Sequence, residues 1–385
     1  MRLPVKLSIG LSVELNGKAN AMVEIDSGIP LVRTAQSSVE QRPMYRILSP
    51  FQFTGWDALI QSFEAGSIFH STAWASVLNE TYGYTPLYIA LRNEGRIQAL
   101  LPVMEVDSTW TGKRGVALPF TDSCPLLAED SVLGEHLFQA AISCGKQQGW
   151  RYFESRCGRA FGRNSNPSET FWEHVIPLEE EEKAFKRLKN EVRTAIRKAE
   201  SEGVRVRADR THAALNTFYQ LHCRTRRRHG LPPQPLAFFQ SIWRHIIRPG
   251  IGSIFLASRD NRPVAAAVFF HFGEQVIFKF GAADERFQHL RPNNLLFWEA
   301  MKGFAKRGYG SLSLGRTSVN DAGLRKFKSG WGAAEEKLHY YRYDLAKSEF
   351  CVLRDKTYGW YNRVFQQLPT SLHRLVGKLV YRHIG

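Results

Sequence analysis

The same order of predicted elements occurs twice along this 385-residue chain, and this repetition restricts its fold more than any other feature. In the first half, PLYIALR and IQALLPVMEV are predicted strands on either side of the polar turn NEGR. In the second half, SIFLASR, VAAAVFFHF and VIFKFGA are predicted strands joined by the turns RDNRP and GEQ. Apolar strands joined by short polar turns are typical of an antiparallel meander.

A helix and one more strand follow each meander. In the first half, GEHLFQAAISCGKQQG is the predicted helix and WRYFESR the strand. In the second half, PNNLLFWEAMKGFAKRG is the helix and YGSLSLGR the strand, with Pro292 at a first-turn position. An antiparallel sheet that ends in a strand–helix–strand crossover, present in two tandem copies, indicates an α+β fold rather than a doubly wound sheet.

The length also suits two domains. The stretch VRTAQSSVEQRP has the composition of a linker, and the globular pattern begins only at Met44. We therefore expect five parts: a disordered linker or misassigned start at 1–43, a first domain at 44–175, a linking basic helix and the start of the second domain at 176–210, the second domain at 211–350, and a basic amphipathic tail at 351–385.

The net charge of +16 is concentrated in three segments. Residues 183–207 carry nine basic and three acidic side chains, 221–230 add four arginines, and 353–385 carry six basic and one acidic side chain. Local positive charge of this kind predicts an anionic partner, such as phosphates, nucleic acid or an acidic lipid surface.

The five cysteines are scattered and form neither a disulfide framework nor a zinc pattern, so we expect a reducing, cytoplasmic setting and no metal. The longest apolar runs are shorter than the ~18 residues of a membrane helix. We expect a monomer, placed on the inner membrane face if the tail binds lipid.

Six segments in a fixed order carry the most specific pattern: FHSTAWASVLNETYGY, ALPFTDSCPLL, VRTAIRKAESEGV, RRRHGLPPQP, PNNLLFWEAMKGFAKRGYG and LGRTSVNDAGLRKFKSGWGA. Together they resemble the FemAB-like group of tandem GNAT-fold acyltransferases. The resemblance implies two GNAT-like domains, each a mixed, mostly antiparallel sheet flanked by helices. It also implies transfer of an acyl or aminoacyl group to an amine of a cell-envelope, peptidoglycan or exopolysaccharide precursor.

Such a transfer needs a base for the amine, stabilisation of the oxyanion and alignment of two substrates, but no nucleophilic side chain. The motifs GxSxG, HExxH and GxxxxGK[ST] are absent, which disfavours hydrolases, metallopeptidases and P-loop enzymes. Neither half contains the Arg/Gln-x-x-Gly-x-Gly/Ala loop that cradles the pyrophosphate of coenzyme A. In family terms this absence favours an aminoacyl-tRNA over acyl-CoA as donor, and we expect no bound cofactor.

Three residues are candidates for the reacting centre. The resemblance implies that Lys328, in FKSGWG, polarises the reacting groups or holds a substrate carboxylate; the alternative is a solvated loop lysine. Arg316 ends a predicted strand and can clamp a phosphate or carboxylate, or form an ordinary surface ion pair. Asp122, in the loop after LPF, is a candidate base from the first half.

On the linking helix, Arg193 and Arg197 lie one turn apart. The resemblance implies that they grip the diphosphate of a nucleotide- or lipid-linked acceptor, whereas a charge stripe on a helix is usually its solvated face.

Six further candidates have ordinary structural alternatives. Asn293 and Asn294 can bind substrate or cap a helix, and Trp298 can stack on substrate or pack in the core. His229 can act as a base or simply end a helix. Glu154 and Arg156 end a first-half strand, where they can face the cleft or pair with each other.

In the tail, the apolar residues recur at helical spacing and the basic ones every four residues: Phe365, Leu368, Leu372, Leu375, Val376 and Leu379, with Arg374, Lys378 and Arg382, after Trp360 and Tyr361. Such a helix can lie in an anionic membrane interface or pack its apolar face on the second domain. Two other functions also remain open: binding of tRNA or another nucleic acid through the basic segments, and an inactive tandem GNAT scaffold.

Overall fold

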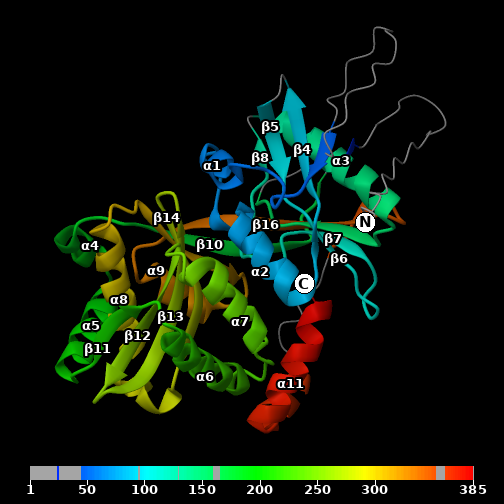
Figure 1. Ribbon diagram of the computed structural model, residues 1–385. Coiled ribbons are helices and arrows are strands. Elements are labelled where there is room, and N and C mark those ends of the chain that lie inside the picture. Colours follow the sequence, from blue (N-terminus) through cyan, green and yellow to red (C-terminus); the bar gives the residue numbers. More distant parts are fainter. Residues whose placement is uncertain are drawn as a thin grey trace, which may run out of the picture.

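The computed structural model describes residues 24–25, 45–93, 96–128, 130–158, 165–352 and 360–384. These residues form two sheets flanked by helices (Figure 1). Of the segment 1–43, only β1 (Glu24–Ile25) is described, and it pairs in parallel with β2 (Tyr45–Leu48). The expectation for the rest of that segment lies outside the described residues.

The first half contributes a small sheet with the order β1-β2-β4-β5-β8 and four short strands of a larger one. The other strands of the small sheet are β4 (Tyr88–Asn93), β5 (Arg96–Leu101) and β8 (Leu127–Ala128). The four short strands are β3 (Thr85–Pro86), β6 (Met104–Val106), β7 (Arg114–Ala117) and β9 (Tyr152–Ser155). The helices of this half are α1 (Trp56–Gln61), η1 (Ile68–His70), α2 (Thr72–Tyr82) and α3 (Ser131–Gln148).

The large sheet runs through both halves in the order β11-β12-β13-β14-β15-β10-β16-β9-β7-β6-β3, and β17 pairs with β16. Its remaining strands are β10 (Glu169–Pro177), β11 (Arg205–Asp209), β12 (Gly252–Arg259), β13 (Arg262–Phe272), β14 (Gln275–Ala283), β15 (Ser311–Ser318), β16 (Ala334–Asp344) and β17 (Glu349–Phe350).

The helices that follow the first half surround this sheet. They are α4 (Glu181–Arg187), α5 (Asn190–Ser201), α6 (His212–Arg228), α7 (Leu236–Ile242), η2 (Trp243–Ile247), η3 (Glu285–Leu290), α8 (Pro292–Ala305), α9 (Ala322–Ser329), α10 (Trp360–Gln367), α11 (Thr370–Val380) and η4 (Tyr381–His383). In the second half, α6 and α7 pack in one hydrophobic core, and α5 and α8 pack in another.

The duplicated order of elements is confirmed, with one correction: the predicted strand IQALLPVMEV is two strands, β5 in the small sheet and β6 in the large one. Each half contains one parallel strand pair bridged by a helix: α3 connects β7 with β9, and α8 connects β14 with β15. The meander β12-β13-β14 is antiparallel throughout. The copies share a sheet because β16 pairs with β10 on one side and with β9 on the other. The domain boundaries stay a prediction, and the one after residue 175 falls within β10.

The linking segment differs from its predicted single helix. It forms two helices, α4 and α5, because Leu188 and Lys189 adopt extended backbone conformations. The Lys189 amide donates to the carbonyl oxygen of Gly330 at 3.0 Å. The Lys189 amide therefore does not donate to a carbonyl oxygen of the preceding helical turn, as it would in a continuous helix. The same bond fixes the start of α5 against the segment that follows α9.

One core joins the two halves. The buried ring of Phe238 on α7 contacts Trp74 and Phe120 of the first half, at centroid distances of 6.1 and 5.8 Å. It also contacts Phe239 and Phe280 of the second half, at 5.5 and 6.1 Å. Edge-to-face and tilted aromatic contacts of this kind stabilise a core beyond their buried area.

We predict that Phe238→Ala lowers the free energy of unfolding by about 3–5 kcal/mol, because it leaves a cavity in a core that both halves share. Guanidinium denaturation followed by tryptophan fluorescence and by far-UV circular dichroism measures this loss. Val132→Ala, at an exposed position on α3, is the matched control and should change stability by less than about 0.5 kcal/mol. A Phe238→Ala effect as small as that of the control would contradict the shared core.

Candidate active site

Strands β14 and β15 lie side by side over only part of their length. They pair in parallel from Gln275 to Ile277 and from Ser311 to Ser313, and no pairing joins them beyond these residues. Gly315 of β15 then has a φ of +69°, in the left-handed region that glycine adopts without a steric penalty. The sheet is therefore interrupted between the carboxyl-terminal parts of two neighbouring strands.

Asp122, from the loop after β7, lies at this interruption. Its carboxylate oxygen is 3.0 Å from the Nζ atom of Lys279 on β14. A Cβ atom added to Gly315 would lie only 3.2 Å from the Asp122 carboxyl carbon. The first half thus inserts a carboxylate between two strands of the second half, and glycine at 315 leaves the room for it.

The ion pair between Asp122 and Lys279 is largely shielded from water. The Lys279 side chain is 6% exposed, and its Nζ atom lies 5.2 Å from the centre of the Phe69 ring. Burial lowers the pKa of Lys279, and Asp122 opposes that effect. Burial would raise the pKa of Asp122, but Lys279 and then Arg316 outweigh it and hold this pKa below its usual range.

A second ion pair positions the loop that carries Asp122. Arg156 contacts Glu154 at 2.8 Å and donates to the carbonyl oxygens of Leu118 at 3.1 Å and Thr121 at 3.3 Å. Burial disfavours the charged form of Glu154, but Arg156 and Arg342 lower its pKa to about 2. Glu154 and Arg156 therefore pair with each other and hold the loop from the end of β9. Tyr340 of β16 also donates its hydroxyl to the Asp122 carbonyl oxygen.

Lys328 is buried beside Gly315 and is not a solvated loop lysine. Its side chain donates to the carbonyl oxygens of Gly315 at 2.8 Å and Arg316 at 3.0 Å. Burial lowers its pKa to about 8, against the opposing effect of Asp122 and Glu173. An ammonium has three N–H groups, so two carbonyl acceptors leave the third for another partner.

Arg316 is exposed beside the same interruption. Its guanidinium lies over the rings of Phe171 at 4.2 Å and Tyr340 at 5.0 Å, a cation–π arrangement that fixes the side chain while leaving its donors accessible. This geometry suits a bidentate contact to a phosphate or carboxylate.

Glu173 of β10 is a second carboxylate at this place, and no sequence motif marks it. It faces Arg316 across the β10–β15 pairing, and Ser313 donates to it at 3.5 Å. Burial, and then the charge of Asp122, raise the pKa of Glu173. The pKa values of Asp122 and Glu173 are thus shifted in opposite directions, and Glu173 is the more basic of the two carboxylates.

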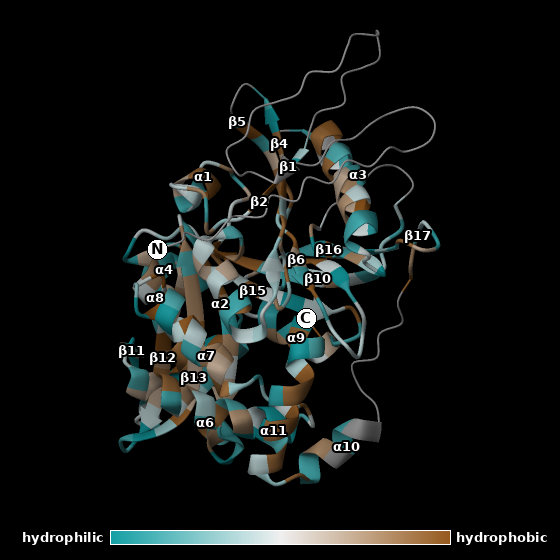
Figure 2. Cartoon of the chain, turned by 45° about the vertical axis from the view of Figure 1, so that its right-hand side comes forward, coloured by the Kyte–Doolittle hydropathy of each residue, from teal (hydrophilic) through white to brown (hydrophobic). Residues whose placement is uncertain are grey.

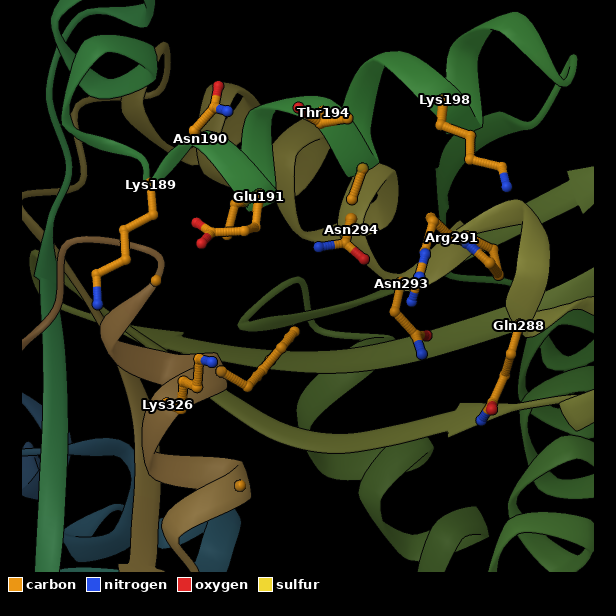
Figure 3. A pocket seen from close by; sticks show the side chains of 16 residues that line it. Lys189, Asn190, Glu191, Thr194, Lys198, Gln288, Arg291, Asn293, Asn294 and Lys326 are labelled. Carbon is orange, nitrogen blue, oxygen red and sulfur yellow. The ribbon is translucent and has the colours of Figure 1, made fainter.

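A cavity of about 810 Å³ lies beside this centre, between α5, α8 and α9. Four basic side chains and one acidic one line it: Lys189, Lys198, Arg291, Lys326 and Glu191. Figure 3 shows the side chains of Lys189 and Lys198 pointing down from the α5 segment and Lys326 approaching from α9. Phe327, next to Lys328, adds an accessible aromatic ring. The cavity therefore combines positive charge with a stacking surface, which suits a phosphate-bearing ligand.

Helix α8 starts at this cavity with an unusual sequence. Arg291 precedes it with a φ of +56°, a value at which glycine would be favoured, and Pro292 occupies the first turn. Proline provides no amide donor, and Asn293 lines the cavity where a small residue would leave more room. This helix start therefore offers a bound pyrophosphate fewer donors and less space than a glycine loop does.

The remaining candidates are divided among the cavity, the helix surface and the core. Asn293 and Asn294 line the cavity. Arg193 and Arg197 do not: the Arg197 guanidinium lies 5.6 Å from the centre of the Phe185 ring. Trp298 is buried against Phe185.

His229 follows the last residue of α6, and its position matches the structural reading of a helix end. Burial lowers its pKa. It does not line either of the two described cavities.

A second cavity, of about 650 Å³, lies where the end of β14 meets the end of α6. Four arginines line it together with two acidic residues and Gln366: Arg224, Arg227, Arg228, Arg286, Asp284 and Glu285. Lys279 and Ala283 lie on the same strand four residues apart, so this cavity begins about 13 Å from the Asp122–Lys279 pair. No group of three or more potential metal-ligating side chains exists among the described residues.

The sequence contains only a weak signal for Lys279 and none for Glu173, the two residues of the site that were not predicted. Lys279 is a single charge within the apolar strand VIFKFGA, and a charged residue in a buried strand usually has a partner. That signal marks Lys279 as unusual, but it cannot name Asp122 as its partner, 157 residues away.

We predict that Asp122→Asn destabilises the protein by about 3–5 kcal/mol, because it leaves the buried charge of Lys279 without its partner. Adding Lys279→Met should restore much of this loss, and denaturant unfolding of both single variants and the double variant measures the coupling. Glu182→Gln, in the exposed Glu182–Lys186 pair, is the control and should cost less than about 1 kcal/mol. Additive effects of the two substitutions would show that the pair is not coupled.

Comparison with known proteins supports the fold. Residues 186–337 match the family model described as an acetyltransferase (GNAT) domain. The structure is similar to that of FemX, with a TM-score of 0.64 and 15% sequence identity over 79% of this chain and 98% of the FemX chain. No curated protein matches the chain in sequence.

Two further solved structures are similar at lower scores. A tandem GNAT protein from the clavulanic acid biosynthesis pathway has a TM-score of 0.51 and 8% identity, over 78% of this chain and 98% of that one. The C-terminal domain of a putative lysylphosphatidylglycerol synthetase from Agrobacterium fabrum has a TM-score of 0.50 and 12% identity, over 74% of this chain and 91% of that one. This chain therefore has the fold of a FemX-like tandem GNAT protein, as its sequence resemblance implied.

Proposed function

We propose that the protein transfers an acyl or aminoacyl group to the amine of a phosphate-bearing cell-envelope precursor. The observation that carries the proposal is the cluster of Asp122, Lys279, Glu173 and Lys328 at the interruption between β14 and β15, with basic cavities nearby. The GNAT match supports acyl transfer as the class of chemistry. Similarity to FemX and to a lipid-modifying synthetase domain supports the cell envelope as the source of the acceptor.

The cavity beside α8 is the proposed donor site. Its basic side chains would bind phosphates, and the exposed Phe327 ring would stack on a base. Since Pro292 removes one amide donor and Asn293 narrows the helix start, the site favours the 3′ end of an aminoacyl-tRNA over the pyrophosphate of coenzyme A.

The arginine-lined cavity is the proposed site for phosphates of the acceptor. Its distance of about 13 Å from the reacting centre requires an acceptor whose amine lies well away from its phosphates. A nucleotide- or lipid-linked precursor with an extended amine-bearing arm has that shape. Arg316, whose carbonyl oxygen accepts from Lys328 and whose guanidinium lies over Phe171, would bind a carboxylate or phosphate along the arm.

The proposed chemistry uses the opposite pKa shifts of two groups. Glu173, with its raised pKa, would accept a proton from the acceptor's ammonium, and the resulting neutral amine would attack the donor carbonyl. When the C–O bond of the donor ester breaks, the leaving ribose oxygen would take up the proton that the nitrogen loses as it becomes an amide. Lys328 would donate its third N–H to the oxyanion that forms on the donor carbonyl. Asp122 remains ionised and paired with Lys279, so we assign it the role of fixing the interruption rather than of a base.

We predict that kcat/KM for the transfer falls as the pH rises through about 8, because Lys328 of the free protein is cationic below its pKa of about 8 and neutral above it. Lys328→Arg should keep part of the activity and lose this decrease, since a guanidinium does not titrate in that range. Lys328→Ala should lower kcat about 10²–10³-fold, as loss of an oxyanion donor does elsewhere. Rates measured at subsaturating substrate from pH 6 to 10 provide the test, and an unchanged decrease in Lys328→Arg would contradict the assignment.

We also predict that charged aminoacyl-tRNA, but not acyl-CoA, supports transfer of a radiolabelled acyl group to nucleotide-linked acceptors. Lys189→Ala combined with Lys326→Ala should raise the KM for tRNA at least about tenfold with little change in kcat, because these side chains contact the donor and not the reacting atoms. Lys347→Ala, an exposed lysine outside the cavity, is the matched control. Turnover of acyl-CoA with unchanged kinetics in the double variant would refute the proposed donor site.

A further inference from the structure

Helix α11 docks on the second half through its small and polar residues. His373 and Tyr381 are buried, and Arg226 of α6 donates to the Tyr381 hydroxyl at 2.8 Å. A Cβ atom added to Gly377 would lie 1.9 Å from the carbonyl oxygen of Pro233, so the backbone of α11 lies directly against the α6–α7 connection. These contacts fix the orientation of the helix.

The same orientation turns three leucines outward. Leu372, Leu375 and Leu379 are 49%, 51% and 52% exposed, and their spacing of three and four residues places them on one face. The sequence pattern is compatible with packing of this apolar stripe on the second domain, but the structure shows these three leucines exposed. Figure 2 shows hydrophobic and hydrophilic segments alternating along α11, which lies at the edge of the molecule.

A tryptophan from the first half is held against the end of this tail. Trp110, between β6 and β7, is 63% exposed, and its ring stacks on that of His383 at a centroid distance of 4.1 Å. Thr111 donates its hydroxyl to the His383 carbonyl oxygen at 2.9 Å, and the Ser108 hydroxyl is 2.9 Å from His383 Nδ1. Ile384, the next residue, is again half exposed. Two segments distant in sequence are therefore held together to present apolar side chains to solvent.

The charge around these residues has one sign. Residues 360–384 contain four basic residues and no acidic one: Arg363, Arg374, Lys378 and Arg382. Arg374, Lys378 and Arg382 recur every four residues along α11 and its extension, on the face next to the leucines, and all are exposed. A surface that is apolar in its centre and positive at its flank is complementary to anionic headgroups above an acyl layer.

We propose that this tail surface, made of Trp110, Leu372, Leu375, Leu379 and Ile384, binds the interface of an anionic phospholipid bilayer. The leucines and the isoleucine would enter the boundary between headgroups and acyl chains, while the basic residues contact lipid phosphates. No helix among the described residues is long and apolar enough to cross a bilayer. The inference goes beyond the proposed transferase function and does not depend on it.

Vesicle co-sedimentation of the full chain tests the proposal. The protein should sediment with vesicles of phosphatidylcholine and phosphatidylglycerol, and much less with phosphatidylcholine alone. Leu375→Ser combined with Leu379→Ser should weaken binding at least about tenfold, because the apolar area that enters the bilayer is lost. Val132→Ser, at an equally exposed position on α3, is the matched control and should bind as the wild type does.

Two further variants separate the contributions and guard against unfolding. Lys378→Gln should weaken binding about fivefold at low salt, the contribution of one basic residue near an anionic surface. Trp110→Ser, on the other segment, should weaken it without lowering the melting temperature, since the ring is mainly exposed.

Two outcomes would overturn the proposal. In the first, the leucine variant binds vesicles normally while Lys189→Ala with Lys326→Ala does not, which would place lipid binding at the donor cavity. In the second, the leucine substitutions convert a dimer to a monomer in light scattering and leave vesicle binding unchanged, which would assign the surface to a second copy of the chain.

Discussion

The ion pair between Asp122 and Lys279 joins the two halves at the place where β14 and β15 stop pairing. A buried lysine without a partner is costly, so β14 can carry Lys279 only if the first half supplies a carboxylate. The position of the Asp122 carboxylate depends in turn on Glu154 and Arg156, because this pair holds the loop that carries Asp122. The candidate active site is therefore a product of both halves, although the GNAT family model covers only residues 186–337.

Local sequence patterns predicted the parts of the fold that local physics determines. The meander of the second half follows from apolar segments between polar turns, and the start of α8 follows from Pro292. Both crossover helices, α3 and α8, are present where the sequence predicted them. The family resemblance added Lys328, whose burial beside Gly315 no helical periodicity could have indicated.

Other features depend on contacts between distant residues, and no local pattern encodes them. The break between α4 and α5 arises because the Lys189 amide bonds to Gly330, and the basicity of Glu173 arises from burial and from Asp122. The tail shows the same limit. Its amphipathic pattern was evident, but the pattern does not reveal that α11 would dock through Gly377 and leave Leu375 in solvent.

The electrostatics of the site also connect the binding of an anionic substrate to the protonation state of Lys328. Burial holds the pKa of Lys328 at about 8, so near neutral pH a fraction of the protein has this side chain uncharged. A phosphate or carboxylate bound at Arg316 would add negative charge close to Lys328 and raise that pKa again. Binding of such an anion would convert the remaining uncharged fraction to the ammonium. Under the proposed function, an anionic substrate would thus stabilise a positive charge that burial disfavours.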